Sequence, residues 1–144
     1  MRKLRDMLTS DLFEVPEPVA QNAGSLSCRA EIAGVMADVV KEIHIDRYEL
    51  AAKMSRLLGR EISKFMIDAY TSESRDTQMP PIDTAIAFDM ATGGISLLKL
   101  YADKLGCKVV VGKEVLFTEL GRIDQARKEL ANQEKAIKKH LEIT

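Results

Sequence analysis

YELAAKMSRLLGREISKFMIDAY, residues 48–70, predicts two short helices joined by a tight turn. Apolar residues of the first helix recur at helical spacing, at Leu50, Ala51, Met54, Leu57 and Leu58. Asp46 and Glu49 resemble a capping box before this helix, and Gly59 is expected to end it in a left-handed conformation. Ser63 is expected to cap the second helix, from Lys64 to about Thr71. Its predicted inward residues are Phe65, Met66, Ala69 and Tyr70.

The pair has the parts of a DNA-binding helix-turn-helix, in which the first helix braces the DNA backbone and the start of the second enters the major groove. The predicted turn comprises residues 60–62. We expect five side chains to be exposed where the second helix begins: Arg60, Ser63, Lys64, Ile67 and Asp68. Arg47, Lys53 and Arg56 would be available for phosphates. Asp68 fits a groove only where it accepts a hydrogen bond from a cytosine.

Charge distribution favours this surface modestly. Residues 47–64 hold five bases and two acids, whereas residues 65–106 hold six acids and three bases. A basic excess suits a phosphate-facing surface. The formal net charge of the chain is -1, however, so two packed helices with a solvated face remain the alternative.

Three further helices surround the pair in the prediction. A helix capped by Ser27 has apolar residues on one face at Cys28, Ile32, Val35, Met36, Val39, Val40 and Ile43. Pro81 suits the first turn of a fourth helix, which runs to about Ala91 through Ile82, Ala85, Ile86 and Met90. A fifth helix, residues 95–105, lies between Gly94 and Gly106.

The segment CKVVV, residues 107–111, predicts one short strand, because it is β-branched and bounded by glycines. A single strand needs a partner, either the N-terminal arm, residues 1–26, or the same strand of another subunit. Within the arm, DLFEVPEP has the acidic and apolar composition of a short docking segment. The alternative is coil or strand lying across the arm's own domain or that of a neighbour.

Residues 113–141 predict one long helix with a heptad seam. Its seam residues are Leu116, Leu120, Ile123, Arg127, Leu130, Glu134, Ile137 and Leu141. Because this apolar seam is long and narrow, we expect it to be buried against a partner helix. We expect a homo-oligomer, with a dimer as the simplest assembly.

Composition and motifs argue against membrane, metal-binding, nucleotide-binding and catalytic functions. Hydrophobic residues make up 46% and charged residues 30% of 144 residues, which is typical of one globular domain. Two distant cysteines, no metal-ligand spacing and no long apolar run predict a reduced cytoplasmic protein without membrane segment, metal or cofactor. The segment VVVGKEV lacks the upstream glycine and the hydroxyl of a phosphate-binding P-loop. No catalytic arrangement is apparent, so we expect no enzyme.

The order of five helices across residues 28–105 resembles the lambda-repressor-like DNA-binding domain, whose second and third helices form the motif. RYELAAKMSRLLGREISKFMIDAYTSESRD, residues 47–76, resembles small proteins of Mu-like transposable prophages. This second resemblance implies a cytosolic phage protein acting in regulation or DNA transactions, and it supplies no catalytic residues.

The expected fold is therefore mainly α, with an arm (1–26), a five-helix bundle with its helix-turn-helix-like pair and one strand (27–112), and a coiled-coil-like oligomerisation helix (113–144). The expected function is that of a non-enzymatic DNA-binding protein in transcription regulation. The alternative is a protein-interaction or assembly module without DNA contact.

Overall fold

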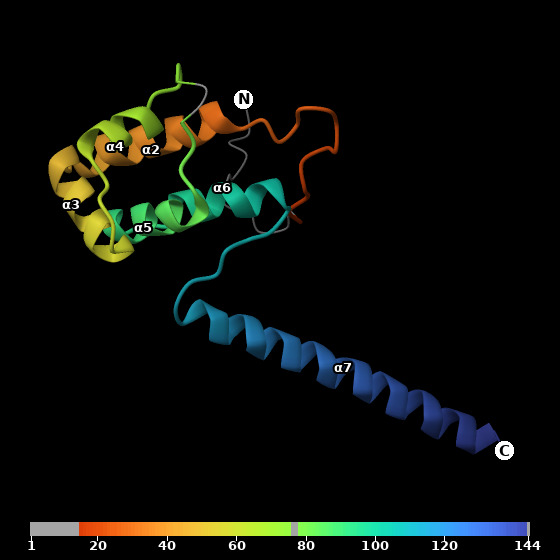
Figure 1. Ribbon diagram of the computed structural model, residues 1–144. Coiled ribbons are helices and arrows are strands. Elements are labelled where there is room, and N and C mark those ends of the chain that lie inside the picture. The colour runs from red at the N-terminus through yellow and green to blue at the C-terminus, as the bar shows by residue number, and fades with distance from the viewer. Residues whose placement is uncertain (1–14, 76–77, 144) are drawn as a thin grey trace, which may run out of the picture. The chain divides into compact units, whose positions relative to one another are not determined.

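The computed structural model describes residues 15–75 and 78–143, and these residues contain six helices and no strand (Figure 1). The chain divides into two compact units, and the boundary between them in the sequence lies between Val109 and Val110. The mainly α class and the long C-terminal helix are thereby confirmed.

The first unit contains the five predicted helices: α2 (Arg29–Ile43), α3 (Arg47–Leu58), α4 (Lys64–Tyr70), α5 (Ile82–Thr92) and α6 (Ser96–Lys104). In this unit α3 packs most extensively on α5, α2 on α6, and α4 on α3. The largest side chains at its centre, each less than 2% exposed, include Met36, Leu50, Met54, Ile67 and Phe88. All five helices therefore contribute to or pack around one hydrophobic core.

Local signals place most of the helix ends correctly. The Asp46 carboxylate accepts a hydrogen bond from the Tyr48 N–H at 2.8 Å, and Ser63 Oγ accepts one from the Met66 N–H at 3.2 Å. Gly59 and Gly93 end α3 and α5 at φ values of 67° and 73°, which glycine adopts without steric cost. Two helix starts were predicted one residue too early. Cys28, instead of Ser27, is the residue before α2, and Pro81 lies just before the first turn of α5 and not within it.

The predicted helix α5 is present, but three of the apolar residues that indicate it are exposed. Ile82, Ile86 and Met90 are 73%, 59% and 65% exposed, whereas Thr84 and Phe88 are buried. Because α5 carries apolar residues on nearly every side, its sequence pattern does not select one face. Packing against α3 makes the selection.

The strand predicted at residues 107–111 is absent from the structure. These residues are coil, and the Cys107 N–H donates to the Ala102 carbonyl at 2.8 Å, which continues the hydrogen bonding at the end of α6. A β-branched run forms a strand only beside a partner strand, and among the described residues these five form no β-bridge. The described part of the arm instead meets the residues just before it, in an isolated antiparallel bridge between Pro18 and Leu105. A docking role for residues 11–14 lies outside the described residues.

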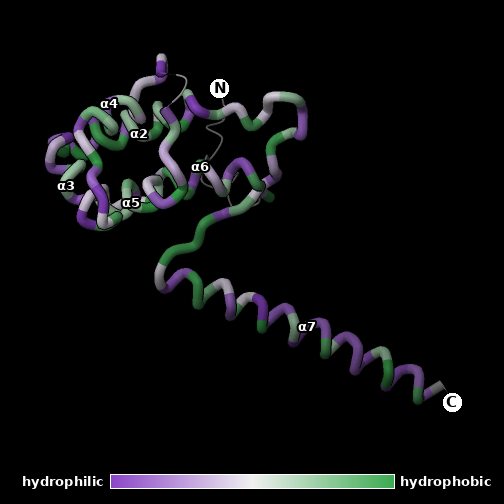
Figure 2. Tube along the Cα trace, viewed as in Figure 1, coloured by the Kyte–Doolittle hydropathy of each residue, from purple (hydrophilic) through white to green (hydrophobic). Residues whose placement is uncertain are grey.

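The second unit contains α7 (Glu114–Ile143), a continuous helix of 30 residues. It matches the predicted long helix, and the purple and green bands along it in Figure 2 reflect alternating polar and apolar residues. Every described side chain of α7 is exposed. In the described ranges, no helix combines the length and apolar character needed to cross a membrane.

Candidate nucleic-acid interface

The turn between α3 and α4 is fixed by a serine on α3. Ser55 Oγ accepts a hydrogen bond from the Ile62 N–H at 2.8 Å and lies 2.7 Å from the Ala51 carbonyl, to which it donates. Ile62 itself is buried at 3% exposure. The turn is therefore anchored at its far end, and it delivers Ser63 to the start of α4. No sequence pattern singles out Ser55 for this role.

Two of the expected phosphate contacts, Lys53 and Arg56, lie on the exposed face of α3. Lys53 Nζ is 3.7 Å from Glu49, a loose pair one helical turn away. Arg56 has no ion pair with any residue in the described ranges. An exposed ion pair such as that of Lys53 contributes little to stability. Lys53 can therefore exchange Glu49 for an external anion at small cost, and Arg56 has no pair to break.

Arg47 and Lys64 are both bound to Asp68. Arg47 Nη1 is 2.7 Å and Lys64 Nζ 2.9 Å from the two oxygens of that carboxylate. Lys64 Nζ also lies 5.9 Å from the ring centroids of Tyr48 and Phe65, which is within the range of a cation–π contact. Asp68 therefore joins the start of α3 to α4, and it neutralises part of the expected basic surface.

Arg60 ties the turn to α5. Its guanidinium donates to both carboxylate oxygens of Asp83, at 2.9 and 3.3 Å, and to Thr84 Oγ1 at 2.9 Å. This planar, two-pronged contact suits arginine better than lysine. Arg60 is thus a partly exposed cation with a structural partner already in place.

Two sequence-based assignments within α4 are reversed. Ile67, expected at the DNA surface, is fully buried in the core, whereas Phe65, expected inside, is 75% exposed. Ser63 is half-buried because its hydroxyl caps α4. The cations predicted for this region remain on α3, the turn and the first turn of α4, and Phe65 joins them as an exposed apolar group.

The pKa of Asp68 is lowered, chiefly by the hydrogen bond from Lys64 and then by that from Arg47, against a desolvation that raises it. The pKa of Asp83 is lowered, chiefly by Arg60. A carboxyl group whose pKa is lower in the folded chain stabilises it above the unfolded value, near 3.9, and loses this effect as pH falls through the folded value.

Stability should therefore decline as pH falls below about 4. Asp68→Asn should be less stable than the parent at neutral pH and should lose less stability on acidification. Urea midpoints measured between about pH 6 and pH 2 test this. Parallel pH profiles for the two proteins would contradict the role assigned to Asp68.

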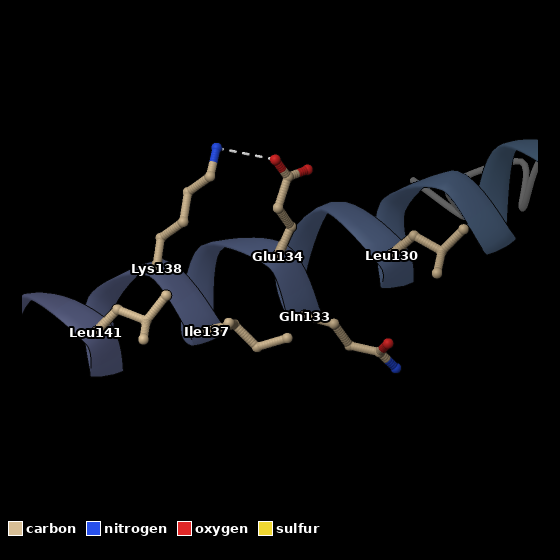
Figure 3. A pocket seen from close by; sticks show the side chains of 6 residues that line it. All are labelled: Leu130, Gln133, Glu134, Ile137, Lys138 and Leu141. Atoms are coloured by element: carbon tan, nitrogen blue, oxygen red, sulfur yellow. Dashed lines mark ion pairs between the residues drawn. The ribbon is translucent and has the colours of Figure 1, made fainter.

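The predicted oligomerisation residues all lie on α7 and are exposed, at Leu116, Leu120, Ile123, Arg127, Leu130, Glu134, Ile137 and Leu141. Figure 3 shows the last part of this helix, where Leu130, Ile137 and Leu141 line a shallow hollow with Gln133, Glu134 and Lys138. Glu134 and Lys138 form an ion pair of 2.8 Å within the helix. The apolar seam is thus presented to solvent along the whole helix.

Asp89 has a structural role outside the α3–α4 surface. The buried Asp89 carboxylate accepts hydrogen bonds from the N–H groups of Leu97 and Leu98, at 3.1 and 3.0 Å, and so holds the start of α6. Cys28 and Cys107 are free thiols. Among residues 15–75 and 78–143, no three His, Cys, Asp or Glu side chains come together as a metal site would require.

Comparison with known proteins adds no relative: the chain matches no protein-family model, no curated protein and no solved structure.

Proposed function

We propose that the protein is a non-enzymatic DNA-binding regulator of the phage type, in which α3 and α4 contact duplex DNA and α7 joins copies of the chain. The order of its helices, with a capped pair at the second and third positions, supports a lambda-repressor-like arrangement. Free thiols agree with action in the cytoplasm.

The observation that carries the proposal is the set of groups on α3 and the first turn of α4. Lys53 and Arg56 are exposed cations for phosphates, and Lys64 lies beside the exposed ring of Phe65. An apolar group next to a cation can contact a thymine methyl while the cation binds the backbone. The Arg47–Asp68 ion pair links α3 to α4 beneath this surface, and the buried Ile67 packs α4 into the core.

Arg56→Glu is the sharpest test, because this side chain has no described ion-pair partner to lose. Fluorescence anisotropy with mixed-sequence duplex DNA at two salt concentrations should show binding by the parent that weakens as salt rises. Arg56→Glu should weaken binding across sequences and reduce the slope of log affinity against log salt by about one. Lys99→Glu on α6, which is also exposed, is the control and should change both quantities much less.

Absence of salt-sensitive binding at micromolar protein would refute DNA binding. Equal effects of Arg56→Glu and Lys99→Glu would refute the α3–α4 surface. Charge reversal at Arg60 or Lys64 is a poorer choice, since each would set two negative charges against each other within the fold.

The second candidate is an assembly module without DNA contact. The exposed seam of α7 favours it, as does the pairing of Arg47, Arg60 and Lys64 with acidic side chains. A chain that oligomerises in light scattering yet fails the anisotropy test would support this candidate over the first.

A further inference from the structure

The seam of α7 alternates steps of four and three residues, which assigns its members to the a and d positions of a heptad. The d positions are Leu116, Ile123, Leu130 and Ile137, and the a positions are Leu120, Arg127, Glu134 and Leu141. The six apolar members are 49–66% exposed on one continuous helix. Two opposite charges therefore occupy a seam that is otherwise aliphatic.

We propose that α7 pairs with α7 of a second copy in antiparallel orientation and over its full length, so that Arg127 of each chain meets Glu134 of the partner. This inference rests on the self-association in the proposed function, and it adds the direction, the register and the residues that select them.

Charge disfavours the parallel arrangement. In a parallel pair a positions pack on a positions, which would set Arg127 against Arg127 and Glu134 against Glu134. The flanking g and e positions would also bring Glu119 close to Asp124 of the other chain. All three contacts join like charges, two of them within the seam, where little water can screen them.

The antiparallel arrangement removes the Glu134–Glu134 and Glu119–Asp124 contacts, and it moves the two Arg127 residues out of a shared layer. With Glu114 of one helix opposite Ile143 of the other, the layers pair Leu116 with Leu141, Leu120 with Ile137, Ile123 with Glu134, and Arg127 with Leu130. Each a position thus packs on a d position. Arg127 then lies between the partner's Arg127, about 4.5 Å away along the axis in one adjoining layer, and the partner's Glu134, about 6 Å away in the other. The two arginines and two glutamates therefore form one neutral cluster, and each glutamate is within reach of an arginine side chain. The opposed helix dipoles also favour this direction.

Both charged residues are available for this exchange. Among the described residues, Glu134 forms an ion pair with Lys138 of its own helix alone. The two side chains are 65% and 69% exposed, so this pair contributes little. Arg127 makes no ion pair with another residue of the described α7. Pairing between chains therefore replaces a weak solvent contact with one shielded by flanking leucine and isoleucine side chains.

Direction has a geometric consequence for the proposed DNA contacts. A helix of 30 residues is about 45 Å long, so antiparallel pairing separates the two points where the linkers join α7 by that length. Parallel pairing would place those two points side by side. The antiparallel dimer therefore suits separated DNA sites.

Disulfide trapping in the full chain tests the direction. In a background carrying Cys28→Ser and Cys107→Ser, we expect Leu120→Cys and Ile137→Cys chains to form a mixed disulfide when combined, and neither to form its own dimer. In the antiparallel register the two sulfurs introduced by Leu120→Cys start from backbones about 25 Å apart, far beyond disulfide reach. Disulfide dimers of either variant alone would overturn the proposal, as would a chain that sediments as a monomer.

Charge reversal provides an independent readout by analytical ultracentrifugation. Arg127→Glu and Glu134→Arg should each raise the dissociation constant of the dimer about tenfold or more, and the double variant should restore it. A parallel dimer would respond little to any of them, because like charges would still face each other. Lys128→Glu and Glu129→Lys, at the outward b and c positions, are the controls. Since no DNA is present, antiparallel pairing and DNA binding can fail separately.

Discussion

Ile67→Ala is expected to lower the free energy of unfolding by about 2–5 kcal/mol, as truncation of a buried aliphatic side chain does. Ile67 is fully buried and belongs to the same core as Leu50, Met54 and Phe88. Because α4 has only seven residues, the cavity left by the lost atoms cannot be filled by sliding this helix without breaking its Ser63 cap. Urea denaturation monitored by circular dichroism measures the loss.

Phe65→Ala is the matched control on the same helix. Its ring is 75% exposed, so truncation should change the free energy of unfolding by no more than about 0.5 kcal/mol. Under the proposed function it should nonetheless weaken DNA binding, whereas Ile67→Ala should affect DNA only through folding. A near-neutral Ile67→Ala together with a destabilising Phe65→Ala would return Ile67 to the surface, where the sequence pattern placed it.

This reversal shows where sequence patterns stop being informative. Helix ends were predictable because capping depends on neighbours: Asp46, Gly59, Ser63 and Gly93 act on groups within about four residues. A short helix such as α4, with Phe65, Met66 and Ile67 in succession and Ala69 after Asp68, offers more than one apolar face. The face that is buried depends on the helices across the core, which the local pattern does not contain.

The electrostatics of the candidate site were beyond prediction for a related reason. Arg47 pairs with a residue 21 positions away and Arg60 with one 23 positions away, so a count of bases within residues 47–64 overestimates the free positive charge. Lys53 and Arg56 remain available to an external anion, because Lys53 has one long ion pair, with Glu49, and Arg56 has none among the described residues. The basic surface is therefore smaller than the sequence suggests, and its centre lies on α3 more than on α4.

Arg29→Met should lower the free energy of unfolding by about 2–3 kcal/mol, since hydrogen bonds from a charged donor to partly buried acceptors contribute more than neutral ones. The Arg29 guanidinium donates to three carbonyls, those of Ala69 at 3.2 Å, Ser72 at 2.7 Å and Gln78 at 3.0 Å. Two of these carbonyls lie at or just beyond the end of α4, where the carbonyl oxygens of a helix lack the N–H donors of a following turn. A cation there also complements the helix dipole.

Arg29 is the first residue of α2, where a positive charge is opposed by the dipole of its own helix. Its stabilising effect must therefore come from α4 and the following loop. Arg29→Lys keeps the charge but lacks the planar fork, so it should recover only part of the loss. Arg56→Met makes the same substitution at an exposed arginine, and it should change the free energy of unfolding very little. Chemical denaturation of the three variants separates these cases. A fully stable Arg29→Met would mean that the loop after α4 is held by its own turns, whereas full rescue by lysine would assign the effect to charge alone.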